Sequence, residues 1–319
     1  MGDLRERILA AHRKSESSHL SPVSLSAEVT NVCNLQCPMC PSVGMKRQKG
    51  MMEIGLYEQV LDEAILMGVN EVGLFSTGES VLHPQIIDFV ELTSKRDIYS
   101  YLSINGALVR DNILEGLVDG GLNSLKFSID AHNQEIYSQV RTGGEFETVI
   151  NNLKETDRLR KAKNSDMKIF ALYTISNINE VYIDDFKKIV APYVDDIFFS
   201  VVYEQGGEGV QISNLRSEKI NSLLERFKRQ SPCLTPSKKI VVSWDGKLTA
   251  CCVDFEMELA YGKYEPGKLA ELWHGEELTK LRTAHENLDV SAYPLCHGCD
   301  QSYHNMEELI TEVNHLFKD

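Results

Sequence analysis

Apolar β-type runs and helical patterns alternate along the first two thirds of the chain. Short runs rich in Val, Ile, Phe, Tyr and Ser/Thr predict strands at 24–30, 71–77, 100–106, 124–130, 167–175 and 196–203. Between them, apolar residues recur every three or four positions, as in "GLYEQVLDEAILMG" and "FETVINNLKETDRLRKAK", which predicts amphipathic helices. Six strand-then-helix repeats predict a parallel α/β sheet with right-handed crossovers.

The number of strand-then-helix repeats indicates whether the sheet closes into a full barrel. Six strands are fewer than the eight of a closed barrel, so we expect an open partial (β/α)6 barrel over residues 24–205. A doubly wound sheet is the alternative. In barrels the chemistry lies at the carboxyl ends of the strands, and here "STGES", "SING" and "SIDA" stand at three of those ends. We therefore expect a ligand site at that edge.

The last third of the chain has a different pattern. "KKIVVSWDGKLTACC" predicts a β-hairpin that turns at Asp245-Gly246, and "LAELWHGEELTKLRTAHE" predicts a helix after it. We expect a small second domain, a β-hairpin plus helix, over residues 233–303. The remaining segments are an N-terminal extension at 1–23, a connector at 206–232 and a closing helix at 304–319.

Composition and charge narrow the class of protein. The chain has 319 residues, of which 42% are hydrophobic and 25% charged, as in ordinary soluble globular proteins. A formal net charge of -14 repels phosphate backbones and argues against a nucleic-acid partner. No apolar run is long enough to span a membrane, and the N-terminus lacks the apolar core of a signal peptide. We expect a cytoplasmic protein with no membrane partner.

The eight cysteines fall into two groups, one near each end of the chain. In a reducing cytosol, clustered cysteines more often hold metal than form disulfides. Cys33, Cys37 and Cys40 have the spacing C-x3-C-x2-C, with no fourth cysteine nearby. Three thiolates can hold three irons of a [4Fe–4S] cube and leave the fourth iron open to a ligand. A structural zinc site, the alternative, normally supplies four protein ligands.

This cysteine motif, placed after a first strand and ahead of βα repeats, resembles that of the radical SAM superfamily. In that family the open iron binds the amino and carboxylate groups of S-adenosylmethionine, and one electron from the cluster releases a 5′-deoxyadenosyl radical that takes hydrogen from the substrate. The resemblance implies a [4Fe–4S] cluster on Cys33, Cys37 and Cys40, S-adenosylmethionine as cosubstrate, and a flavodoxin- or ferredoxin-type electron donor.

Further family motifs can be placed on this chain. "FSTGESVLHP" resembles the Gly-Gly-Glu-Pro element that receives the methionine amino group, although Thr77 replaces its first glycine and Ser80 its proline. Arg141 resembles the arginine that pairs with the methionine carboxylate. Helix caps and turns are the alternative role for the serines and the asparagine of the set. The resemblance implies a complete cosubstrate-binding set of Met39, Gly78, Glu79, Ser103, Asn105, Ser128 and Arg141.

The second cysteine group brackets the predicted hairpin and helix and ends on C-x2-C. It resembles the Twitch domain, the shortened form of the SPASM domain, and so implies a second [4Fe–4S] cluster. Four protein ligands leave no open iron, so this cluster would carry electrons, while structural zinc is the alternative. Cys252 is left over as a packed cysteine, an exchange ligand for Cys251 or a hydrogen-atom donor. The implied ligands are Cys233, Cys251, Cys296 and Cys299.

The gaps in this group resemble those of the butirosin-pathway aminocyclitol dehydrogenases and their relatives. We therefore expect an oxidoreductase that converts a carbinol carbon of a small sugar or aminocyclitol to a ketone, with the second cluster accepting an electron. Tyr203 and Glu204, at the end of the last strand, and Arg216, on the connector, are the expected catalytic residues. A solvated surface position is the alternative for Arg216.

Three other functions stay open at this point. A sugar epimerase would use Cys252 as its hydrogen donor. A radical SAM maturase would modify a peptide or protein instead of a small molecule. A non-enzymatic iron–sulfur carrier is the last alternative, and the motif with one open iron argues against it, because a carrier needs four ligands per cluster.

Overall fold

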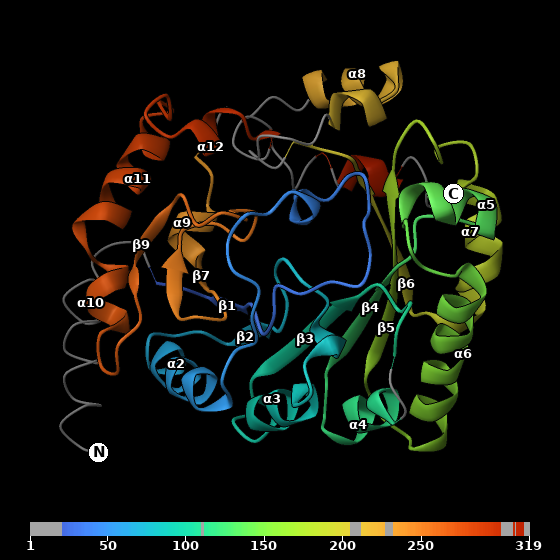
Figure 1. Ribbon diagram of the computed structural model, residues 1–319, viewed down its shortest axis with the longest axis horizontal. Coiled ribbons are helices and arrows are strands. Elements are labelled where there is room, and N and C mark those ends of the chain that lie inside the picture. The colour runs from blue at the N-terminus through green and yellow to red at the C-terminus, as the bar shows by residue number, and fades with distance from the viewer. Residues whose placement is uncertain are drawn as a thin grey trace.

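A single mixed sheet of nine strands forms the centre of the protein. The structure is a computed structural model and describes residues 21–109, 112–204, 212–226, 232–300, 309 and 311–315. The strands follow the order β6-β5-β4-β3-β2-β1-β7-β8-β9 (Figure 1). The first six run parallel and neighbour one another in chain order: β1 (Ser24–Ala27), β2 (Glu71–Gly73), β3 (Tyr99–Ile104), β4 (Ser124–Ser128), β5 (Lys168–Ile175) and β6 (Asp196–Val201).

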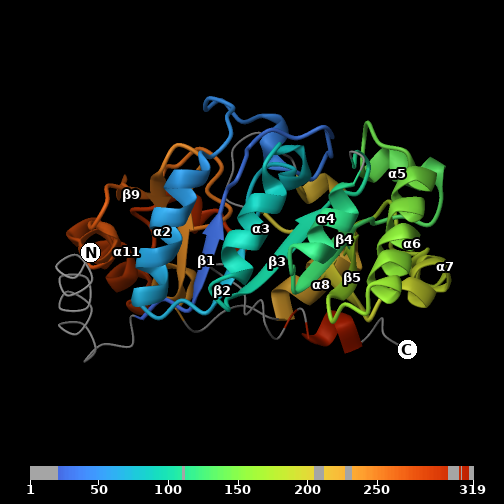
Figure 2. The same ribbon diagram turned by 90° about the horizontal axis from the view of Figure 1, so that it is seen from below.

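Helices follow the parallel strands and cover the outer face of the sheet. In Figure 2, α2, α3, α4 and α6 lie side by side across that face. The consecutive strand order has no reversal point, which a doubly wound sheet requires, so the expected α/β partial (β/α)6 barrel is confirmed. These helices are α2 (Ile54–Leu66), α3 (Ile86–Ser94), α4 (Ile113–Asp119), α5 (Gln134–Val140), α6 (Phe146–Ala162) and α7 (Ile183–Val190).

The two faces of each strand differ in polarity. On β3, Leu102 and Ile104 are buried with the core residues of the helical layer, whereas Tyr101 and Ser103 line the inner side. This follows from the period of two along a strand. In a closed barrel the inner side is packed with branched apolar residues. Here hydroxyl and charged side chains stand beside apolar ones such as Leu172 and Phe199, and the space it encloses is hollow.

The predicted hairpin is confirmed, and it continues the sheet of the barrel. Strands β7 (Lys239–Val242) and β8 (Lys247–Thr249) are antiparallel, and Gly246 has the positive φ of 83° that the turn requires. A third strand, β9 (Ala260–Lys263), pairs with β8. Strand β7 runs parallel to β1, with Leu25 opposite Ile240. The C-terminal unit therefore shares main-chain pairing with the first strand.

A buried carboxylate adds a second tie between the two parts. Glu63 on α2 accepts hydrogen bonds from the Tyr264 hydroxyl at 2.6 Å, the Gly267 amide at 2.6 Å and the Leu269 amide at 3.1 Å. The predicted C-terminal helix is interrupted after Trp273. The helices of this half are α8 (Glu218–Arg226), α9 (Thr235–Lys238), α10 (Leu269–Trp273), α11 (Glu276–Glu286) and α12 (Pro294–His297).

Parts of the predicted chain ends lie outside the described residues. Residues 1–20 of the expected N-terminal extension and most of the expected closing helix at 304–319 are among them, although 311–315 are helical. Within the described ranges, no helix combines the length and the apolar character needed to cross a membrane.

The shared sheet predicts that both parts unfold together. Ile240→Pro places proline in a strand paired on both sides and should lower the free energy of unfolding by about 3 kcal/mol or more. Chemical denaturation followed by circular dichroism should show one transition shifted as a whole. Ile240→Val keeps the amide and should cost only about 0.5–1.5 kcal/mol. A barrel transition left unchanged by the proline would contradict the prediction.

Candidate active site

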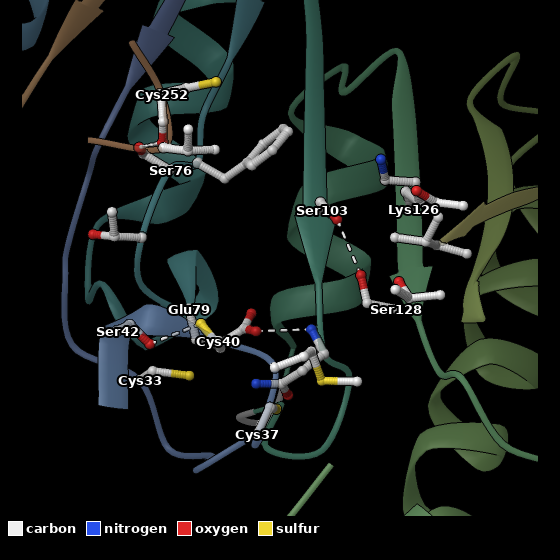
Figure 3. Close-up of a pocket in the computed structure, with 18 of the residues that line it drawn as sticks. Cys33, Cys37, Cys40, Ser42, Ser76, Glu79, Ser103, Lys126, Ser128 and Cys252 are labelled. Carbon is white, nitrogen blue, oxygen red and sulfur yellow. Dashed lines mark hydrogen bonds between the residues drawn. The ribbon is translucent and has the colours of Figure 1, made fainter. Parts of the chain in front are cut away.

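A cavity of about 600 Å³ lies on the inner side of the sheet. Its wall is formed by the parallel strands, the loop that carries the first three cysteines, β7 and the segment after β8. Figure 3 shows part of this lining, with side chains from separate strands pointing into one space. All seven residues predicted to bind the cosubstrate line this cavity: Met39, Gly78, Glu79, Ser103, Asn105, Ser128 and Arg141.

Cys33, Cys37 and Cys40 line one wall of the cavity together. The Cys40 amide donates to the Cys37 carbonyl at 3.0 Å, and the Cys40 sulfur lies 3.0 Å from the Ser42 hydroxyl (Figure 3). Burial raises the pKa of Cys33 to about 11, and Glu79 and the other two thiols add to the shift. The three sulfurs therefore lie within electrostatic range of one another.

The donor set of this loop fits a cluster. No three His, Cys, Asp or Glu side chains of the described ranges are close enough to share a single metal ion. Thiolates that bind different irons of a cube lie farther apart than the ligands of one ion, and three of them leave one iron for another ligand. Cys33, Cys37 and Cys40, which share one cavity wall, offer the three thiolates that a [4Fe–4S] cluster with one exchangeable position needs.

Glu79 is a buried carboxylate beside these cysteines. Its Oε2 accepts a hydrogen bond from the Asn105 amide at 2.7 Å, while its Oε1 is buried and has no hydrogen-bond partner within the described part of the chain. Burial raises the pKa of Glu79 to about 7. A buried acceptor without a donor is uncommon in folded proteins, and an incoming ammonium group would supply one.

The backbone at Gly78 approaches the cysteine loop closely. A Cβ atom at this position would lie 2.3 Å from the Thr30 carbonyl oxygen and 2.7 Å from that of Val32. The next amide, that of Glu79, donates to the Val32 carbonyl at 2.8 Å. Gly78 is therefore required for the contact between two loops, and this contact places the Glu79 carboxylate.

Arg141 is held by a neighbouring acid. Its Nη2 lies 2.5 Å from Oδ2 of Asp130, and its Nη1 lies 3.9 Å from the Cys37 sulfur. Burial alone would lower the pKa of Arg141, but Asp130 and the nearby thiol keep it raised, so the guanidinium stays charged. Its Nε has no hydrogen-bond partner among the described residues. The group is thus a fixed cation whose Nε–H has no acceptor among the described residues.

The remaining polar residues of the set have partners within the protein. The Ser103 and Ser128 hydroxyls lie 3.3 Å apart across β3 and β4 (Figure 3). The Asn105 side chain accepts from the Ala107 amide at 2.8 Å and donates to Asn34 at 3.0 Å. The turn role expected as the alternative for Asn105 is therefore present, and the same side chain also ties the end of β3 to the cysteine loop.

The three predicted catalytic residues are placed differently from one another. Tyr203 lines the cavity, whereas Glu204 and Arg216 are not among its lining residues. Arg216 forms an ion pair with Asp300 and donates to the Val202 carbonyl at 3.0 Å, and its side chain is only 9% exposed. The Glu204 amide donates to Asp300 at 2.7 Å. Arg216 is therefore neither a cavity residue nor a solvated one, because Asp300, 84 positions along the chain, holds it against the end of β6.

The second cysteine group abuts the same cavity. The pKa of Cys251 is raised by its hydrogen bond with Cys252, by burial and by the neighbouring charge of Cys299, so these sulfurs lie near one another. Cys296 and Cys299 are buried, and Cys233 and Cys251 are half-buried. Cys252, the spare cysteine, lines the cavity, and its carbonyl accepts from the Ser76 hydroxyl at 3.2 Å.

Sequence reasoning missed an ion pair that joins four segments around the site. Glu28, fully buried at the end of β1, accepts from Arg47 Nη1 at 2.8 Å and from the Thr77 hydroxyl. The Trp244 amide donates to it at 3.3 Å. A single carboxylate within the apolar run 24–30 was the only local signal. Thr77, which stands where the family motif has glycine, thus has a structural partner.

The fold and the cysteine motifs define the class of the protein. The sequence profile of the radical SAM superfamily matches residues 27–190, and that of SPASM, an iron–sulfur cluster-binding domain, matches residues 233–300. The chain belongs to the radical SAM superfamily. Its cofactors are S-adenosylmethionine and [4Fe–4S] clusters, with one cysteine set in each matched region.

Individual proteins resemble the chain over different lengths. The tungsten-containing aldehyde ferredoxin oxidoreductase cofactor-modifying protein of Pyrococcus furiosus is 23% identical over 310 residues, which cover 86% of each chain. The PqqA peptide cyclase of Gluconobacter oxydans is 32% identical over 108 residues, or 34% of this chain and only 30% of that protein. The crystal structure of BtrN in complex with AdoMet and 2-DOIA has a TM-score of 0.55 at 17% identity, over 87% of this chain and 92% of that chain. This last likeness shows a shared fold.

The buried position of Glu28 predicts a large effect of removing its charge. Glu28→Gln leaves the Arg47 guanidinium, only 12% exposed, without its counter-ion and should lower the free energy of unfolding by about 3–5 kcal/mol. Urea denaturation of the cluster-free protein measures this change. The matched control is Glu155→Gln, which removes an exposed pair with Arg158 and should cost less than about 1 kcal/mol. Equal losses in the two variants would disprove the structural role of Glu28.

Proposed function

We propose that this protein is a radical SAM oxidoreductase that oxidises a carbinol carbon of a small polar substrate, a sugar or cyclitol, to a ketone. One observation carries the proposal. The cavity is bounded by the loop of Cys33, Cys37 and Cys40 and also by Cys252, the neighbour of Cys251 in the second set. A substrate in this cavity would lie between the two cysteine sets, as removal of a hydrogen atom and then of an electron requires.

The cofactors supply the redox chemistry, and the chain supplies position. When bound, S-adenosylmethionine with the first cluster provides the acceptor for the hydrogen atom of the C–H bond, and the second cluster provides the acceptor for the remaining electron. The hydroxyl proton leaves to solvent through the hydrogen bonds of the cavity, so the substrate loses two hydrogens in all. Tyr203 is the proposed partner of that hydroxyl, because it is the one predicted catalytic residue that lines the cavity.

The other residues have proposed binding roles. Cys33, Cys37 and Cys40 would hold the first cluster, and the ligands of the second would be Cys233, Cys251, Cys296 and Cys299. Glu79 would receive the methionine ammonium on its unpartnered oxygen, and Arg141 would face the methionine carboxylate. Hydroxyl side chains supply the hydrogen bonds that a polyol needs: Ser26, Ser103, Ser128, Thr174 and Ser200 line the cavity.

Epimerisation is the second candidate, and the position of Cys252 favours it. An epimerase starts with the same hydrogen abstraction and then returns a hydrogen atom to the opposite face of the carbon. Cys252 lies on the cavity wall outside the proposed ligand sets, where its thiol would reach a bound substrate. The similarity to a PqqA peptide cyclase supports peptides as a third substrate class to be assayed beside small molecules.

The role of Glu79 predicts a pH-dependent affinity for S-adenosylmethionine. Glu79→Gln should weaken binding by about 1.5–3 kcal/mol, since a charged hydrogen bond is lost. In the free site the pKa of Glu79 is about 7, well above the usual value, so the carboxylate forms only as pH rises through neutrality. Calorimetry on the reconstituted protein should therefore show affinity rising with pH across that pKa in the wild type.

Two variants test whether the pH dependence of the affinity comes from Glu79. Glu79→Gln should flatten the pH dependence, whereas Glu91→Gln, at an exposed position on α3, should leave both affinity and slope unchanged. The same slope in the wild type and in Glu79→Gln would remove Glu79 from the cosubstrate site.

Product analysis separates oxidation from epimerisation. Oxidation predicts a product lighter than its substrate by two hydrogens, with one 5′-deoxyadenosine formed per turnover. Cys252→Ala should then keep its iron and most of its activity. Mass spectrometry and iron assay of both proteins test this. A product of unchanged mass that gains one deuterium in heavy water and disappears in Cys252→Ala would establish the epimerase instead.

A further inference from the structure

Two lysines line the cavity and have no part in the chemistry described so far. Lys126 comes from the middle of β4, and Lys239 begins β7. Both are half-buried, in strands that are not neighbours in the sheet. Their charges nevertheless interact: burial lowers the pKa of Lys126, and the Lys239 ammonium lowers it further. The curvature of the sheet thus brings two like charges toward one space.

The two ammonium groups differ in the partners they have inside the protein. In the described part of the chain, the only charged group that acts appreciably on Lys126 is Lys239, and no carboxylate pairs with it. Lys239 bonds to the Tyr101 hydroxyl, and the charges of Cys252, Tyr101 and Glu71 keep its pKa raised in spite of burial. Lys126 is therefore the half-buried cation without a counter-charge, and an uncompensated charge of this kind disfavours the empty protein.

These lysines are also distinct from the proposed cosubstrate contacts. In Figure 3, Lys126 lies across the space from Cys37, and the candidate carboxylate partner Arg141 is 3.9 Å from the Cys37 sulfur. Together, Lys126, Lys239 and Tyr101 offer two positive charges and one hydroxyl from the inner face of the sheet.

We propose that Lys126 and Lys239 bind an oxyanion group of the substrate, so that the substrate is an acidic or phosphorylated sugar or polyol and not an aminated one. The inference deepens the proposed function, on which it rests by taking this cavity as the substrate site. Carboxylate and phosphate oxygens accept charge-assisted hydrogen bonds from ammonium and hydroxyl donors, as this set would provide. An amino group placed here would be repelled by both lysines.

The test compares probes that share one hexose ring and differ in charge. Binding to the reconstituted enzyme with S-adenosylmethionine is measured by calorimetry for glucuronate, glucose-6-phosphate, glucose and glucosamine. At least one anion should bind about ten- to a hundredfold more tightly than glucose, the range expected of charged hydrogen bonds. The stronger of the two anions identifies carboxylate or phosphate as the group recognised.

Variants assign that preference to the lysines. Lys126→Met and Lys239→Met should each reduce anion affinity by a similar factor, and Lys126→Arg should keep most of it. Lys95→Met, at the exposed position that follows α3, should change nothing. Lys126→Met should also leave the ligand-free protein as stable as the wild type or more stable, since a structural lysine would have the opposite effect.

Defined outcomes overturn the inference. It fails if neither anion binds the wild type more tightly than glucose, if glucosamine binds as tightly as the anions, or if the preference persists when Lys126→Met and Lys239→Met are combined in one protein. Failure of the oxidation is seen separately: an anion that binds through the lysines, yet yields no product lighter by two hydrogens, would refute the proposed reaction and leave the anion site standing.

Discussion

The buried carboxylate of Glu28 is the interaction on which the arrangement of the site depends. It joins β1 to Arg47 of the cysteine loop, to Thr77 in the segment that follows β2 and to Trp244 in the hairpin turn. Each of these segments carries part of the cavity wall or borders it. A charge buried this deeply is tolerated only while its partners stay in place, so the four segments are held in one arrangement. Arg47 extends the network by donating to the Phe255 carbonyl at 2.6 Å.

The two faces of the sheet differ in composition, and this difference explains how a hollow barrel remains stable. Alternate residues such as Leu125 and Phe127 on β4 are fully buried under the helices. The residues between them, Lys126 and Ser128, face the cavity. Apolar burial on the outer side thus provides the stability, and the inner side is free to carry polar groups that would be costly in a packed core. The alternation of apolar and polar residues along each strand therefore specifies both the packed outer face and the polar inner face.

The sequence predicted the features that depend on local patterns. Strand and helix positions followed from periodicity, the hairpin from Asp245-Gly246, and the two iron–sulfur regions from cysteine spacing. Contacts between residues far apart in the sequence have no local pattern from which they could be predicted. Glu28 meets Arg47 across 19 positions, and Arg216 meets Asp300 across 84. The pairing of β7 with β1 and the approach of Lys126 to Lys239 also depend on how the sheet curves, which no short window of sequence records.

The pairing of β7 with β1 has a consequence for how this protein can be divided. A fragment that ended before β7 would leave the β1 edge with unsatisfied amides and carbonyls, a template for association with other chains. The superfamily profile and the SPASM profile therefore do not mark two modules that could be shuffled or expressed apart. The same ladder joins the two matched regions by backbone hydrogen bonds, so a relative movement at this seam would require breaking them.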